Sequence, residues 1–280
     1  MGDPGFLRTD MRAVGAQRAG VQCQRTLLGA QVQKQAEMTP NTLFVILLFL
    51  FVLGGMAVFF VNRKKERNER QNSWIKYFVY FFIVNTLFAS ISYCPALFRI
   101  FCVMIVLGGS WELIRLQHRS HPPACNRFGL FFPVYLLTSV LFCLFSFGVQ
   151  GILSFTLLMV CSFDAFSQLS GQWFGKRKIC PQISPDKTIG GTVGGTIVSM
   201  MVSVIAGCHT GWGPGLASIM GLGIAGASFA GDLAASYVKR QFAVKDFGRT
   251  FPGHGGFLDR FDSLMLSGAF MYLFQLFCRQ

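Results

Sequence analysis

The chain contains few charged residues. Only 13% of its 280 residues are charged, and 12 acidic residues stand against 25 lysines and arginines. None of the nine cysteines is spaced as C-x-x-C, which excludes the usual thiolate zinc site and gives no sign of a disulfide framework. The order G-x-x-x-x-G-K-[ST] is also absent, which excludes a Walker A loop.

Apolar residues take the place of the missing charge. They make up 52% of the chain, Phe occurs 31 times, and the mean hydropathy is +0.48. Several runs approach the roughly 20 apolar residues that cross a bilayer core. The sequence therefore predicts an all-α, polytopic integral membrane protein with about eight transmembrane helices. We place them near residues 43–61, 74–92, 96–114, 128–147, 152–170, 192–208, 214–235 and 264–277.

The basic residues fall in alternate loops. They cluster after the first, third, fifth and seventh predicted spans, and the intervening loops are nearly free of Lys and Arg. Basic loops of membrane proteins stay in the cytoplasm, so we expect these four loops, and any site they carry, on the cytoplasmic side. The net charge of +13 then indicates contact with the lipid bilayer and gives no reason to expect nucleic acid as a partner.

The amino-terminal 37 residues differ from the rest of the chain. They are polar, rich in Gln and Arg, and lack an apolar core, so they do not resemble a secretory signal. A disordered arm, a targeting segment and an upstream extension of a chain that starts at Met38 are all compatible with this composition. We assign this extension no function.

One stretch, residues 236–262, is unusually dense in charge for this chain. With Asp232 just before it, it contains four of the twelve carboxylates. If the preceding helix continues, Asp232, Ser236 and Lys239 or Arg240 share one face. Carboxylates spaced like Asp259 and Asp262 can hold Mg²⁺ against phosphate oxygens. An ordinary set of interfacial ion pairs is an equal alternative on spacing alone.

Four further features outside or within this stretch are candidates for a role in the site or the bundle. The turn Pro252-Gly-His-Gly-Gly favours close backbone approach, and Ser184 to Gly191 contains a lysine and opens a helix whose amino terminus favours anions. The Gly- and Ala-rich span 214–235 is expected at the centre of the bundle. Glu112 is as compatible with a buried ion pair as with a plain interface position.

The stretch 236–262 resembles the signature of the phosphatidate cytidylyltransferase (CDP-diacylglycerol synthase) family, S-x-x-K-R, four residues, K-D, then P-x-H-G-G-x-x-D-R-x-D. The chain matches it at Ser236, Lys239, Arg240, Lys245, Asp246, Pro252, His254, Gly255, Gly256, Asp259, Arg260 and Asp262. The similarity covers residues 128–280 well, as a catalytic transmembrane core, and the transmembrane helices of residues 38–127 loosely.

The resemblance implies an integral membrane nucleotidyltransferase that transfers CMP from CTP to phosphatidic acid, giving CDP-diacylglycerol for phospholipid biosynthesis. It implies Mg²⁺, leaves a second, monovalent cation open, and is compatible with a homodimer. In a bacterium the enzyme would lie in the inner membrane. The implied catalytic residues are Asp232, Asp246, Asp259 and Lys239, and the implied metal ligands are Asp232, Asp259 and Asp262. Substrate binding is implied for Ser184, Lys187, Ser236, Arg240, Lys245, His254, Gly255, Gly256 and Arg260.

Two positions depart from the family pattern. Ala235 and Gly190 stand where members usually carry a glutamate, and a glutamate or glutamine, respectively. The departures keep open a related cytidylyltransferase that acts on a different lipid phosphate. From another class, a membrane transporter would use Asp164 and Asp232 to line a path. That interpretation leaves the basic loops unexplained.

Overall fold

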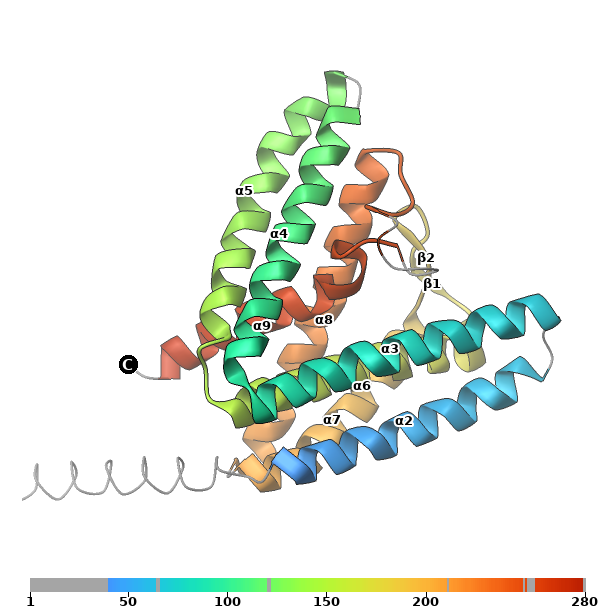
Figure 1. The fold of residues 1–280 in the computed structure, drawn as a ribbon. Coiled ribbons are helices and arrows are strands. Elements are labelled where there is room, and N and C mark those ends of the chain that lie inside the picture. Colours follow the sequence, from blue (N-terminus) through green and yellow to red (C-terminus); the bar gives the residue numbers. More distant parts are fainter. Residues whose placement is uncertain are drawn as a thin grey trace, which may run out of the picture.

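The structure is a computed structural model that describes residues 40–63, 66–119, 122–210, 212–248, 250 and 255–278. Within these residues the chain forms eight helices and one β hairpin (Figure 1). The helices are α2 (Pro40–Asn62), α3 (Arg67–Tyr93), α4 (Pro95–Arg119), α5 (Pro122–Phe145), α6 (Gln150–Phe174), α7 (Ile189–Thr210), α8 (Pro214–Gln241) and α9 (Leu258–Cys278). The strands are β1 (Lys178–Cys180) and β2 (Ser184–Thr188).

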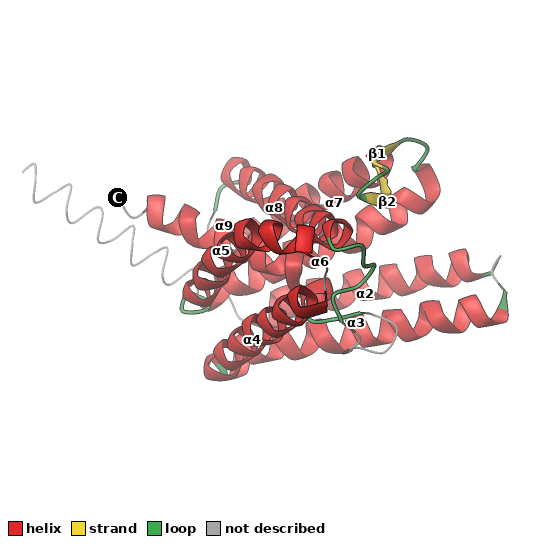
Figure 2. Cartoon of the chain, turned by 90° about the horizontal axis from the view of Figure 1, so that it is seen from above, coloured by secondary structure: helices red, strands yellow, loops and turns green. Residues whose placement is uncertain are grey.

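Every predicted span coincides with one of these helices. Seven helices are long and apolar enough to cross a membrane, and the apolar part of α5 is a shorter segment, Gly129–Phe145. The predicted all-α, polytopic membrane fold is therefore confirmed. Seen from above, the hairpin lies at the edge of the helices (Figure 2). The bounds differ most at α3, α5 and α9, which begin six or seven residues before their predicted starts, and at α8, which continues past residue 235 to Gln241.

The centre of the bundle is α6. It packs most extensively against α7 and also contacts α2, α3, α8 and α9. Every residue from 153 to 163 is buried, as expected for a helix that has protein on all sides. The Gly-rich helix α8, which the sequence placed at the centre, lies instead between α7 and α9 and is less enclosed than α6.

The outer surface of the helices is apolar. Large side chains such as Val45 and Phe49 on α2 and Phe82 on α3 are 62%, 61% and 67% exposed. Exposed apolar patches of this extent are costly in water, whereas lipid accommodates them. Together with the seven long apolar helices, this surface identifies a multi-pass membrane protein.

The hairpin connects α6 to α7 and prepares the start of α7. Its strands pair antiparallel, with Lys178 opposite Thr188. The Thr188 hydroxyl accepts a hydrogen bond from Gly191 N at 3.1 Å, which caps the first turn of α7. The sequence predicted that this segment opens a helix, and that is confirmed; the two short strands were not anticipated.

Helices α8 and α9 approach closely beside the charged residues. At Gly231 of α8, an added Cβ would lie 2.6 Å from the backbone oxygen of Asp262 on α9. Glycine is required here because the neighbouring atom is backbone, which cannot turn away as a side chain can. The contact brings the backbone next to Asp232 against the backbone of Asp262.

We expect Gly231→Ala to destabilise the protein by about 1–3 kcal/mol, the usual cost of overpacking. Gly226→Ala is the matched control, because it lies on the same helix and an added Cβ there meets nothing within 4 Å. Thermal unfolding in detergent should show a lower midpoint for Gly231→Ala and an unchanged or slightly higher one for the control. Equal midpoints for both variants would contradict the close approach.

Candidate active site

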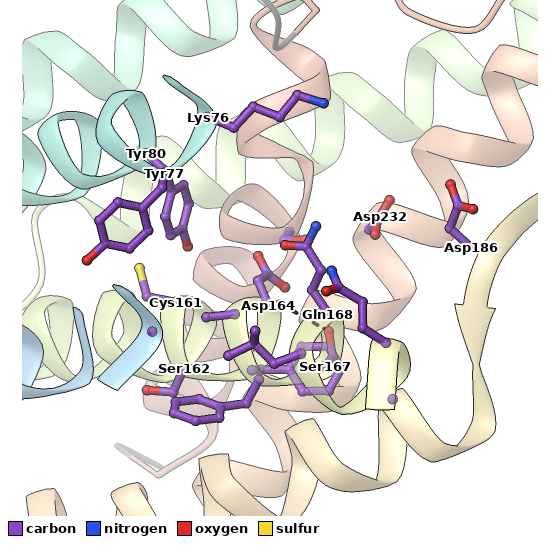
Figure 3. Close-up of a pocket in the computed structure, with 18 of the residues that line it drawn as sticks. Lys76, Tyr77, Tyr80, Cys161, Ser162, Asp164, Ser167, Gln168, Asp186 and Asp232 are labelled. Carbon is purple, nitrogen blue, oxygen red and sulfur yellow. Dashed lines mark hydrogen bonds between the residues drawn. The ribbon is translucent and has the colours of Figure 1, made fainter. Parts of the chain in front are cut away.

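A cavity of about 690 Å³ opens between α2, α3, α6, the hairpin, α8 and α9. Its wall on α2 is apolar along most of its length, with Leu47, Leu50, Phe51 and Val58, and ends at the polar Asn62. The opposite wall is charged, with Asp164, Asp186, Lys187, Asp232, Asp259, Arg260 and Asp262. In Figure 3, Lys76 reaches over the cavity from α3, while Asp164 and Gln168 rise from α6 toward Asp232. The same cavity thus has one apolar wall and one charged wall.

Three carboxylates from three helices share the charged end. Asp164 is on α6, Asp232 on α8 and Asp262 on α9, and all three side chains line the cavity. Ser228 Oγ donates to Asp164 Oδ1 at 2.8 Å, and Ser263 N donates to Asp262 Oδ1 at 2.7 Å. Carboxylates that line one cavity favour a cation among them, because their mutual repulsion needs compensation.

Lys187 supplies one such cation. Strand β2 carries it to the cavity, where Nζ lies 2.8 Å from Asp232 Oδ2. The same Nζ lies 3.4 Å from Phe229 O and 4.4 Å from the centroid of the Phe229 ring. Asp232 remains 44% exposed despite this pair, so its carboxylate is open to the cavity.

Lys239 and Asp259 form the second ion pair. Lys239 Nζ lies 2.8 Å from Asp259 Oδ1, and the two side chains are 14% and 5% exposed. Asp259 Oδ2 accepts hydrogen bonds from Phe247 N and Gly256 N, each at 2.9 Å. Asp259 therefore ties together the loop from α8 to α9. The metal role that the family resemblance implied for it stays a prediction.

The two glycines of the H-G-G turn leave room for carboxylates of the protein. Gly255 has φ +81°, which glycine adopts readily, and its missing side chain leaves space for the Asp259 carboxylate. At Gly256 the corresponding space is taken by the carboxylate of Glu112. Both glycines were predicted to bind substrate; here they allow the loop to close around two acidic side chains. His254 lies outside the described residues.

Glu112 is the site residue that the sequence left undecided. It lies on α4, is 4% exposed, and accepts hydrogen bonds from Phe257 N at 2.9 Å and Leu258 N at 3.0 Å. The available signal was an acidic residue inside a predicted membrane span, where a charge is expensive unless it is partnered. Its partners are 145 and 146 residues away in sequence, so spacing alone did not identify them.

The remaining predicted residues divide into two groups. Ser184 and Arg260 line the cavity, and Ser236 Oγ donates to Asp232 Oδ1 at 3.4 Å, on the helix face that the spacing predicted. Lys245, Asp246 and Arg240 are exposed and do not belong to the cavity wall. Arg240 Nε instead donates to Ile183 O at 3.1 Å, which attaches the end of α8 to the hairpin.

The two departures from the family pattern occupy tight places. At Gly190 an added Cβ would lie 2.7 Å from Phe174 O, so the present backbone leaves no room for a glutamate or glutamine there. Ala235 is 8% exposed and lies on α8 three residues after Asp232. Both positions are therefore packed against other atoms of the protein. Neither leaves an empty space in the charged wall where the family carries a polar side chain.

The donor set suits Mg²⁺ bound together with phosphate. Among the described residues, no group of three or more His, Cys, Asp or Glu side chains converges closely enough to hold a metal ion. Mg²⁺ commonly takes only one or two carboxylates, several waters and substrate phosphate oxygens. Asp232 and Asp262 are two hard oxygen donors on the cavity wall, and the metal roles that the family resemblance implied for them stay predictions.

Comparison with known proteins places this chain in a family. A family model described as "Cytidylyltransferase family" matches residues 36–278. Phosphatidate cytidylyltransferase of Brucella abortus is 40% identical over 125 residues, which are 43% of this chain and 45% of that protein. An uncharacterised protein, YnbB of Escherichia coli, is 36% identical over 135 residues, 47% of this chain and 45% of its own length.

A third relative agrees with these. Phosphatidate cytidylyltransferase of Aquifex aeolicus is 34% identical over 110 residues, 39% of this chain and 41% of that protein. The chain thus spans less than half the length of the curated relatives it matches. The family model, by contrast, extends from before α2 to the end of α9, and this chain belongs to the cytidylyltransferase family.

Proposed function

We propose that the protein transfers CMP from CTP to phosphatidic acid, forming CDP-diacylglycerol and pyrophosphate. A phosphate oxygen of the lipid attacks the α-phosphorus of CTP, the bond from that phosphorus to the bridging oxygen breaks, and pyrophosphate leaves. Such a transfer depends mainly on positioning and on neutralising charge. The observation that carries the proposal is the cavity with one apolar and one charged wall.

The two walls suit the two substrates. The apolar side chains of α2 would accommodate the acyl chains of a lipid that enters from the bilayer. The charged end would hold the triphosphate, because Lys187 and Arg260 face the same hollow as the carboxylates. The lipid phosphate and the α-phosphorus would then meet between the walls.

Mg²⁺ would be held at the charged end by Asp232 and Asp262, with Asp164 behind them. When bound, it neutralises negative charge on the phosphates as the leaving group departs. The chain itself keeps Asp232 oriented through Lys187 and Ser236, and keeps Asp259 oriented through Lys239. CTP and phosphatidic acid as partners, and Mg²⁺ as cofactor, belong to this proposal.

The active site would face the cytoplasm. The end of α2, the hairpin and the start of α9 all border the cavity, and the end of α8 is attached to the hairpin. These are the connections that carry the basic loops, which membrane proteins retain on the cytoplasmic side. CTP is then available where the cavity receives it.

Purified wild-type protein should incorporate labelled CTP into an organic-extractable lipid when given phosphatidic acid and Mg²⁺. Asp232→Asn should lower the rate by about 100-fold or more, because it removes charge where the reacting phosphates are held. Glu69→Gln, the same chemical change on the exposed start of α3, should retain wild-type activity. A wild-type preparation that is folded and labels only a different lipid phosphate would favour the related cytidylyltransferase.

Lys187→Gln should raise the KM for CTP about tenfold or more, since a charged hydrogen bond contributes about 1.5–3 kcal/mol. The KM for phosphatidic acid should change much less. Lys178→Gln is the matched control, because Lys178 lies on the partner strand of the same hairpin and is exposed outside the cavity wall. Equal KM values for CTP in both variants would argue against a triphosphate contact.

Orientation can be checked at the two ends of α6. In a cysteine-free background, Gln150→Cys should react with a membrane-impermeant maleimide added outside intact cells. Lys178→Cys, just beyond the other end of α6, should react only after the cells are opened. The reverse pattern would place the basic loops outside and contradict the proposed orientation.

A further inference from the structure

The amino-terminal end of α9 is held by a side chain from a distant helix. The first N–H groups of a helix have no partner within the helix, and they carry the positive end of its dipole. At the start of α9, the N–H groups of Phe257, just before the helix, and of Leu258, its first residue, donate to Oε1 and Oε2 of Glu112 at 2.9 and 3.0 Å. Glu112 thus acts as a capping residue supplied by α4.

Glycines around Glu112 leave the space that its side chain and the neighbouring Phe257 ring occupy. Added Cβ atoms at both Gly248 and Gly256 would run into Glu112 oxygens. One turn before Glu112, Gly108 leaves room for the Phe257 ring, with which an added Cβ would collide at 2.8 Å. Thr250 Oγ1 also donates to Glu112 Oε1 at 3.2 Å. Two separate parts of the loop between α8 and α9 therefore meet at one buried side chain.

The contact leads directly to the charged wall of the cavity. Asp259 follows Leu258, and its Oδ2 accepts from Gly256 N and Phe247 N. A shift of residues 256–258 would move Asp259 and its ion pair with Lys239. Asp262 lies one helical turn further along α9 and would move with it.

We propose that Glu112 is a positioning residue for the reaction. From α4, it fixes Gly248, Thr250 and residues 256–258, and through them the orientation of Asp259 and Asp262 on the cavity wall. Its effect on turnover rests on the proposed function, whereas its effect on the loop rests on geometry alone. The two effects can therefore be measured separately.

Glu112→Gln is the principal test. The variant keeps the size of the side chain but turns one acceptor into a donor, which then faces a backbone N–H. Hydrogen–deuterium exchange in peptides covering residues 255–260 should become at least about tenfold faster, while peptides from α6 and α7 stay as in wild type. The kcat should fall at least about tenfold, with the KM for phosphatidic acid within about twofold, because the α2 wall is untouched.

The control and the second variant address folding. Glu69→Gln makes the same chemical change at an exposed position of α3 and should alter neither exchange nor kcat. Gly248→Ala leaves Glu112 in place but crowds its carboxylate, and should change exchange and kcat in the same direction as Glu112→Gln. It provides the test if Glu112→Gln fails to fold.

The outcomes are distinct. Wild-type exchange at residues 255–260 in a folded Glu112→Gln, or in Gly248→Ala, would overturn the anchoring role. Faster exchange with wild-type kcat would overturn the link to the reaction. A wild-type protein that turns over no lipid phosphate with CTP would count against the proposed function, and the exchange measurement would still decide whether Glu112 holds the loop.

Discussion

The buried ion pair between Lys239 and Asp259 is the constraint on which the rest of the site depends. At 2.8 Å and nearly out of solvent, it joins the end of α8 to the start of α9. Removing one partner of a buried pair is costly, because the remaining charge has no water to stabilise it. The other oxygen of Asp259 binds the connecting loop. The positions of both helix ends and of the loop are therefore linked through one carboxylate.

This arrangement explains why so many small residues surround the charges. Gly231 allows α8 and α9 to touch beside Asp232 and Asp262, and Gly255 and Gly256 make room for Asp259 and Glu112. The carboxylates occupy space that side chains would otherwise fill. Hydrogen bonds to backbone N–H groups then compensate the cost of burying acidic groups among apolar helices.

The helices before residue 128 contribute directly to the site. Helix α2 supplies the apolar wall of the cavity, α3 covers part of it, and α4 provides Glu112. A catalytic unit limited to residues 128–280 would lack that wall and that cap.

The sequence by itself determined the membrane-spanning fold, the eight helical segments and the charged stretch 236–262, because hydropathy and a dense local signature are visible in one dimension. Helical spacing also placed Asp232 and Ser236 on one face, as the structure has them. Only the tertiary structure brought Asp164 to Asp232 and Asp262, left Asp246 and Lys245 at the surface, and gave Glu112 its partners. Those relations join residues dozens to more than a hundred positions apart, and they follow from how the helices pack, which no local pattern encodes.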